Sequence, residues 1–257
     1  MNKDQIRQIV NVLAVIVMIT INILANALPI NGQNTGEISD RFQVFFVPAG
    51  YVFSIWGLIY IGLLAFAVYQ ALPAQRENPR LRKIGYWFAL SCLANSVWIF
   101  LWHYNLFPLS LIVMLVLLAA LLVIYLRLDI GRTRVTTVER WCVNIPFSVY
   151  LGWITVATVA NVTDVLYDLG WNGFGIAPET WAVIMLIIAA GLGVAMAVTR
   201  RDVAYLLVLV WAFAGIGVKQ AAVPLVATTA WIVTALMIFM IFYSVIARKG
   251  QASPVPA

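Results

Sequence analysis

Residues 48–60, which read PAGYVFSIWGLIY, are the stretch that decides the fold. A proline opens an apolar run in which Trp56 and Tyr60 stand four residues apart, so both rings share one face of a helix. A plain membrane anchor needs only Leu, Ile and Val, whereas Trp and Tyr bring polar groups that cost several kcal/mol when buried without partners. We therefore interpret this stretch as a membrane-spanning helix that contributes to a binding site.

Two further stretches repeat this combination of aromatic and polar residues. Residues 95–98 read NSVW, and residues 150–153 read YLGW and are followed by Asn161. Asn95 and Trp98 share one helix face, and Tyr150 and Trp153 share another. Together the three stretches predict one aromatic pocket where their helices meet. For any single residue the alternative stays open that it only joins helices, through hydrogen bonds of about 0.6 kcal/mol.

The composition places these stretches in a membrane protein. Of 257 residues, 63% are hydrophobic and 10% are charged, against roughly 25% charged in soluble domains. The hydrophobic residues form blocks of about 20, the length that crosses a bilayer. The sequence thus predicts an all-α, polytopic bundle of about eight transmembrane helices. The predicted spans are 8–30, 49–72, 84–104, 108–126, 141–163, 179–199, 203–218 and 223–247.

The distribution of charge predicts the orientation. With a cytoplasmic N-terminus, nearly all of the 16 basic residues fall in inner segments, and only Arg41 and Lys219 fall outside. The inner set is Lys3, Arg7, Arg76, Arg80, Arg82, Lys83, Arg127, Arg132, Arg134, Arg140, Arg200, Arg201, Arg248 and Lys249. The positive-inside rule then predicts that both termini are cytoplasmic, in a bacterial inner membrane. Because the charges are spread over five short segments, we expect no nucleic-acid partner.

The two longest connections, 31–47 and 164–178, lie on the predicted outer face. Both contain aromatic residues, which suggests lids on the membrane surface, with an interfacial aromatic belt as the alternative. The first of these loops leads directly into Pro48, so we expect it to cover an outward-facing mouth of the pocket and to gate ligand entry.

The ionisable residues and cysteines suggest no catalytic or metal site. All ten acidic residues map to loops or helix ends, which disfavours an ion-coupled pump, since such proteins carry intramembrane carboxylates. The only histidine, His103, is expected at the outer interface, and Lys219 is expected to snorkel there. Cys92 and Cys142 are expected to be packing residues. No acid/base pair is present for ordinary catalysis.

The three stretches resemble the TspO/MBR family, which comprises the tryptophan-rich sensory proteins, translocator proteins and peripheral-type benzodiazepine receptors. That family is a five-helix bundle, and the resemblance covers residues 8–163. Val47, Tyr51 and Val149 replace family residues, and three further helices follow. We therefore predict a five-helix core at 1–165 and a membrane extension at 166–257. The residues that carry the resemblance, and the predicted ligand-binding set, are Pro48, Trp56, Tyr60, Asn95, Trp98, Tyr150, Trp153 and Asn161.

The resemblance implies a function in binding tetrapyrroles such as porphyrins, or sterol-like lipids, as a sensor, carrier or regulator. It implies no obligatory cofactor, and it leaves light-dependent porphyrin degradation open. The expected partners are the lipid bilayer, a small hydrophobic ligand and a second copy of the chain in a homodimer. The alternative function is a small-molecule permease or exporter.

Overall fold

The computed structural model describes residues 2–28 and 30–250. Within these residues it contains helices and connecting turns and no strand. The C-terminal tail beyond residue 250, for which a cytoplasmic location is predicted, lies outside the described residues. The long helices are α1 (Lys3–Ala27), α3 (Ile55–Ala71), α5 (Trp87–His103), α6 (Phe107–Arg127), α8 (Ile145–Asp168), α9 (Pro178–Arg200), α10 (Val203–Lys219) and α11 (Pro224–Gly250). The short ones are α2 (Thr35–Asp40), α4 (Pro79–Ile84) and α7 (Thr137–Glu139).

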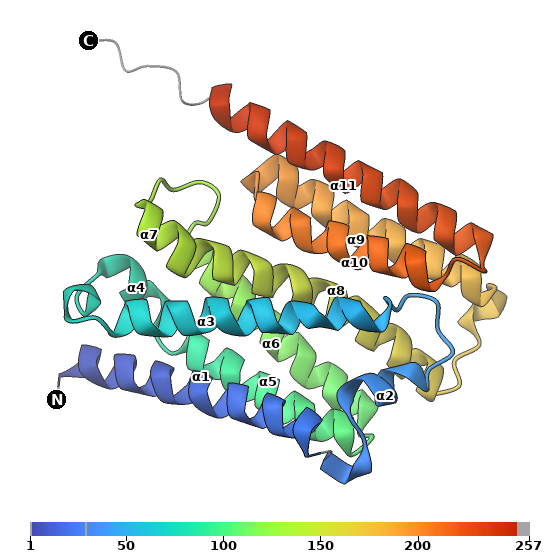
Figure 1. Cartoon of the computed structure of the whole chain (residues 1–257), viewed down its shortest axis with the longest axis horizontal. Coiled ribbons are helices and arrows are strands. Elements are labelled where there is room, and N and C mark those ends of the chain that lie inside the picture. The colour runs from blue at the N-terminus through green and yellow to red at the C-terminus, as the bar shows by residue number, and fades with distance from the viewer. Residues whose placement is uncertain (1, 29, 251–257) are drawn as a thin grey trace.

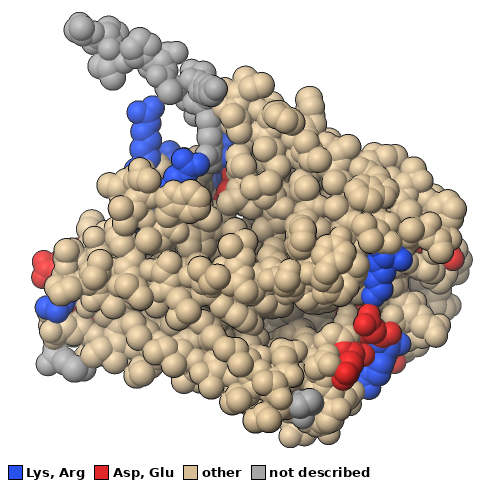
Figure 2. All heavy atoms as spheres, viewed as in Figure 1, with Lys and Arg blue, Asp and Glu red and all other residues tan. Residues whose placement is uncertain are grey.

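The long helices have the length and composition of membrane spans. Six helical runs in the described part of the chain are long and apolar enough to cross a bilayer, and α5 and α10 are shorter apolar helices of 17 residues each. Seventeen residues is the lower limit for a spanning helix. Charged side chains on the face in Figure 2 gather toward the ends of the molecule and leave a broad uncharged belt between them. The predicted multi-pass helical bundle is confirmed.

Five of the helices form a closed ring. α1 packs on α3, α3 on α8, α8 on α6, α6 on α5, and α5 returns to α1 (Figure 1). Proline in the first turn of α6 starts that helix without losing an internal hydrogen bond, because that N–H has no helical partner. Pro146 in the first turn of α8 instead follows directly on the π-helical turn Arg140–Asn144. The ring brings the three aromatic stretches, on α3, α5 and α8, around one interior.

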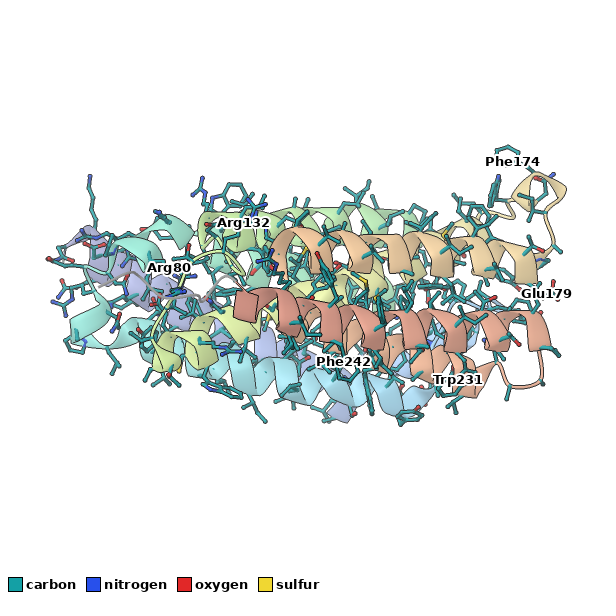
Figure 3. All side chains as sticks on the ribbon, turned by 90° about the horizontal axis from the view of Figure 1, so that it is seen from above. Arg80, Arg132, Phe174, Glu179, Trp231 and Phe242 are labelled. Carbon is teal, nitrogen blue, oxygen red and sulfur yellow. The ribbon has the colours of Figure 1, made fainter. Side chains whose placement is uncertain are left out.

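The last three helices form a layer against one side of this ring. α10 packs on α8, while α9 and α11 pack on α10 and on each other (Figure 1). The contact is close because Gly152 of α8 faces α10: an added Cβ would lie 3.1 Å from Val208 Cβ. The outer surface of this layer is apolar, with Trp231 and Phe242 of α11 exposed (Figure 3).

The connections alternate between the two ends of the bundle. α1 begins and α11 ends at the same end of the molecule (Figure 1). Arg80 and Arg132 lie toward this end, and Phe174 and Glu179 lie at the opposite one (Figure 3). Basic connections therefore share one end, as the alternation of helices requires.

The fifth span differs from its prediction at both ends. A π-helical turn, Arg140–Asn144, precedes α8, and α8 continues through Asp168 instead of ending at residue 163. The helix continues past residue 163 because no glycine or proline follows until Gly170, which has a positive φ of 66°. Asp164, predicted in the outer loop, is therefore inside α8, and its side chain is buried. The prediction that every acidic residue lies in a loop or at a helix end is wrong at this position.

Candidate functional site

Four of the predicted aromatic residues form one contact group, which we call the inner cluster: Trp56, Tyr60, Tyr150 and Trp153. The Trp56 ring stacks on Tyr60 at a centroid distance of 5.6 Å. The Trp56 ring also meets two rings of α8 edge-on, with centroid distances of 6.1 Å to Tyr150 and 6.3 Å to Trp153. These separations are those of favourable aromatic pairs. The i, i+4 spacing in α3 and the i, i+3 spacing in α8 thus bring their rings together across the helix interface.

A chain of amide groups borders the inner cluster. Asn95 of α5 donates from Nδ2 to the Tyr150 hydroxyl at 3.1 Å, and its Oδ1 accepts from Asn22 Nδ2 of α1 at 2.7 Å. Asn95 and Asn22 are both buried. Sequence reasoning omitted Asn22 from the site, although an asparagine in the middle of an apolar helix is a signal that such a partner exists.

The indole N–H of Trp153 is fully buried and has no acceptor among the described residues. Its side chain is 3% exposed, and Nε1 has no hydrogen-bond partner among the described residues. An unpaired buried donor costs about 1–3 kcal/mol. The inner cluster therefore presents a donor that a bound molecule can satisfy.

Two other predicted residues form a separate outer cluster. Trp98 Nε1 donates to Asn161 Oδ1 at 3.2 Å, and Asn161 Nδ2 donates to Ser110 Oγ of α6 at 3.3 Å. The Trp98 ring stacks on Trp102 at 5.2 Å. Asn161 lies eight residues after Trp153 on α8, a rise of about 12 Å. The predicted set therefore divides into two clusters at two levels of the ring.

The loop 31–47 covers the outer cluster. Ile38 of α2 and Phe42 are buried against Trp102 and Phe107, and Phe42 meets the Phe107 ring edge-on at 4.9 Å. Asn34 caps α2 in a reciprocal capping box with Glu37, which fixes the start of this short helix. Phe42 and Phe46 are thus interior residues of the protein, and the prediction that these loop aromatics lie on the membrane surface is wrong for both.

Side chains at the outer end of the bundle hold the loop 31–47 in place through hydrogen bonds and an ion pair. His103 is fully buried, with Nε2 3.0 Å from Thr35 Oγ1 and Nδ1 3.1 Å from the Ile30 carbonyl oxygen. Lys219 at the end of α10 pairs with Asp40 of α2 at 2.8 Å. His103 is therefore an interior side chain, held by Thr35 and Ile30. Lys219 stays partly exposed beside Asp40, and its location at the outer membrane interface stays a prediction.

Pro48 belongs to neither cluster. It is buried beside α10, where a Cβ on Gly215 would lie 3.3 Å from the Pro48 Cβ. The next residue, Ala49, donates its N–H to the Gly215 carbonyl oxygen at 3.1 Å, and Trp211 Nε1 donates to the Val52 carbonyl oxygen at 3.0 Å. Pro48 therefore helps to hold the start of α3 against α10.

Two surface grooves flank α1, and neither is lined by a predicted site residue. One, of about 450 Å³, lies beside the end of α3 and includes Arg76. The other, of about 370 Å³, lies between α1 and α5. The predicted residues instead fill the interior of the ring with one another's side chains.

The model of the family described as TSPO-like protein matches residues 8–243 of this sequence. The chain belongs to the TSPO-like protein family. No curated protein and no solved structure matches it. The match spans α9 and α10 and most of α11, beyond the residues 8–163 that carry the resemblance in the sequence. The division into a core at 1–165 and an extension at 166–257 stays a prediction.

Proposed function

We propose that this protein binds a flat, mostly apolar molecule, with tetrapyrroles such as porphyrins as the first candidates, and acts as a membrane sensor, carrier or regulator. Sterol-like lipids are the second candidate class. Membership of the TSPO-like family and the apolar helices support a multi-pass membrane protein of the ligand-binding type. The identity of the ligand is our inference from the site.

The observation that carries this proposal is the unpaired indole N–H of Trp153 within a group of contacting aromatic rings. Aromatic faces stack on a planar ligand, and a buried donor selects a ligand with an acceptor such as a carboxylate or carbonyl. A protoporphyrin supplies both features, the planar face from its macrocycle and the acceptors from its carboxylate side chains. Ligand entry requires Trp56 and Tyr60 to move, since their rings are in contact with each other.

We expect Trp153→Phe to lower the affinity for protoporphyrin about tenfold, because phenylalanine keeps a ring but loses the hydrogen-bond donor. Binding is measured on the purified protein in detergent from the shift of the porphyrin Soret band. This readout does not depend on the fluorescence of the tryptophan that has been removed.

The matched control is Trp141→Phe. Trp141 lies near the start of the same helical run and is 63% exposed, and its indole N–H makes no hydrogen bond with a described residue. Its substitution should leave the affinity within about twofold. Equal affinities for both variants and the wild type would contradict the assignment of Trp153.

Four further sequence predictions belong with this proposal. Flux of protoporphyrin through the protein in proteoliposomes would favour the alternative of a permease or exporter. The bacterial inner membrane, the cytoplasmic termini and the homodimer are further inferences. Labelling of a Ser253→Cys variant by an impermeant reagent outside intact cells would overturn the predicted orientation.

A further inference from the structure

The carboxyl group of Asp164 on α8 is buried and has no partner in the described part of the chain. It lies on α8, three residues after Asn161, and is 4% exposed. It makes no hydrogen bond or ion pair with any of the residues that the structure describes. Its position near the outer end of the helix places it at the level of the covering loop and beyond the outer cluster.

Asp164 continues the stripe of α8 that builds the site. Tyr150, Trp153, Ala157, Asn161 and Asp164 follow one another at intervals of three or four residues, which is one face of a helix. Asn161 accepts the Trp98 indole N–H about one helical turn below Asp164. The carboxyl group thus stands on the same side of α8 as Asn161, whose side chain contacts Trp98.

The nearest candidate for a protein counter-ion is already engaged. Lys219, at the end of α10, points its Nζ to Asp40 of α2 at 2.8 Å and forms no ion pair with Asp164. Arg41 is likewise bound elsewhere, to the Asn105 side chain. Neither cation therefore forms an ion pair with Asp164.

An isolated carboxylate in a protein interior is costly, and it takes up a proton or finds a cation. Ionisable side chains within membrane spans face the bundle interior and mark sites where ions, protons or charged ligands bind. Stacked aromatic rings add to the attraction for a cation, because their faces carry negative partial charge.

We propose that Asp164 binds a positively charged nitrogen of the ligand, so that the site prefers flat, apolar molecules that carry a protonated amine. This proposal rests on the proposed function and specifies the ligand class of the same site. Without ligand, the carboxyl group holds a proton. When the ammonium group arrives, that proton leaves for water and the ion pair forms in its place.

Other titratable groups at this end of the bundle must be separated from Asp164. Lys219 and Asp40 form a pair, His103 lies between Thr35 and the Ile30 carbonyl, and Asp168 is exposed one turn further along α8. The test therefore compares two probes that share the porphyrin ring and differ in the charge of their side chains.

The probes are protoporphyrin IX dimethyl ester, with neutral side chains, and the bis(2-aminoethyl) amide of protoporphyrin IX, with two ammonium groups. Asp164→Asn should weaken binding of the cationic probe about thirtyfold relative to wild type. A loss of this size is typical when one partner of a buried charge pair is removed. Affinity of wild type for this probe should rise with pH, by at most about tenfold per unit. The variant should lose this pH dependence.

The neutral ester measures binding that does not depend on a charge on the ligand. Its affinity should be the same within about twofold for wild type, Asp164→Asn and the exposed control Asp168→Asn, which also shows that the variants are folded. If both probes bind and Asp164→Asn changes neither affinity, the role of Asp164 is wrong and the proposed function stands. If neither porphyrin binds the wild type, the proposed function and the role of Asp164 both fail.

Discussion

Replacement of Asp202 by alanine should lower the free energy of unfolding by about 3–5 kcal/mol, the typical cost of breaking a buried network of charged hydrogen bonds. Asp202 precedes α10 and is 4% exposed. Its Oδ2 accepts from the Tyr125 hydroxyl at 2.7 Å and from the Ser148 hydroxyl at 2.6 Å. Its Oδ1 accepts backbone N–H groups of α10. One carboxyl group thus joins α6, α8 and α10.

The expected loss of stability is large because Asp202→Ala leaves two buried hydroxyl groups without an acceptor. Tyr125 is 1% exposed and Ser148 is 2% exposed, so both hydroxyls would stay buried without their acceptor. The first turn of α10 would also lose its cap, at a cost of about 1 kcal/mol. Asp202→Asn keeps one acceptor oxygen and should lose less stability than Asp202→Ala.

Unfolding of the purified protein in detergent micelles, followed by circular dichroism, measures the difference. Asp168→Ala is the matched control, because Asp168 is exposed and forms no hydrogen bond or ion pair with a described residue. It should change the stability by less than about 0.5 kcal/mol. A loss for Asp202→Ala no greater than that of the control would show that the network is not stabilising.

The number of long helices and their up-and-down alternation could be predicted because both depend on local features of the sequence. Blocks of apolar residues set the spans, and the alternation of basic segments sets their order. The end of α8 was mispredicted because Asp164 stands where a loop was expected, and a charged residue is a weak signal for a helix end. The packing of Val165 against Phe42 and Trp102, which holds this turn, comes from a distant segment.

The site could be predicted as a set of residues but not as a set of contacts. Helical spacing showed that Trp56 shares a face with Tyr60, and that Tyr150 shares one with Trp153. It carried no information on which helices are neighbours in the ring. For this reason Asn22, the partner of Asn95, was missed, and Pro48 was grouped with residues that it does not join.

Gly215→Leu should speed ligand dissociation about tenfold, which corresponds to about 1.4 kcal/mol. A Cβ at this position would lie 2.2 Å from Val52 Cγ2, too close for any real contact, so α10 and the start of α3 must move apart. Overpacking of this kind costs about 1–3 kcal/mol. The Ala49 N–H bond to the Gly215 carbonyl oxygen would be strained at the same place.

The effect should reach the ligand because Val52 lies one turn before Trp56, whose ring contacts both Tyr150 and Trp153. Loosening the 3₁₀ turn Gly50–Ser54 frees that tryptophan to move away from its partners. Gly191→Leu is the control: Gly191 lies on α9, and an added Cβ there meets no atom within 4 Å. Dissociation of protoporphyrin is measured by stopped-flow absorbance after dilution into an acceptor protein. Equal rates for the two glycine variants would mean that α10 does not control the site, and that the last three helices act only as a separate layer.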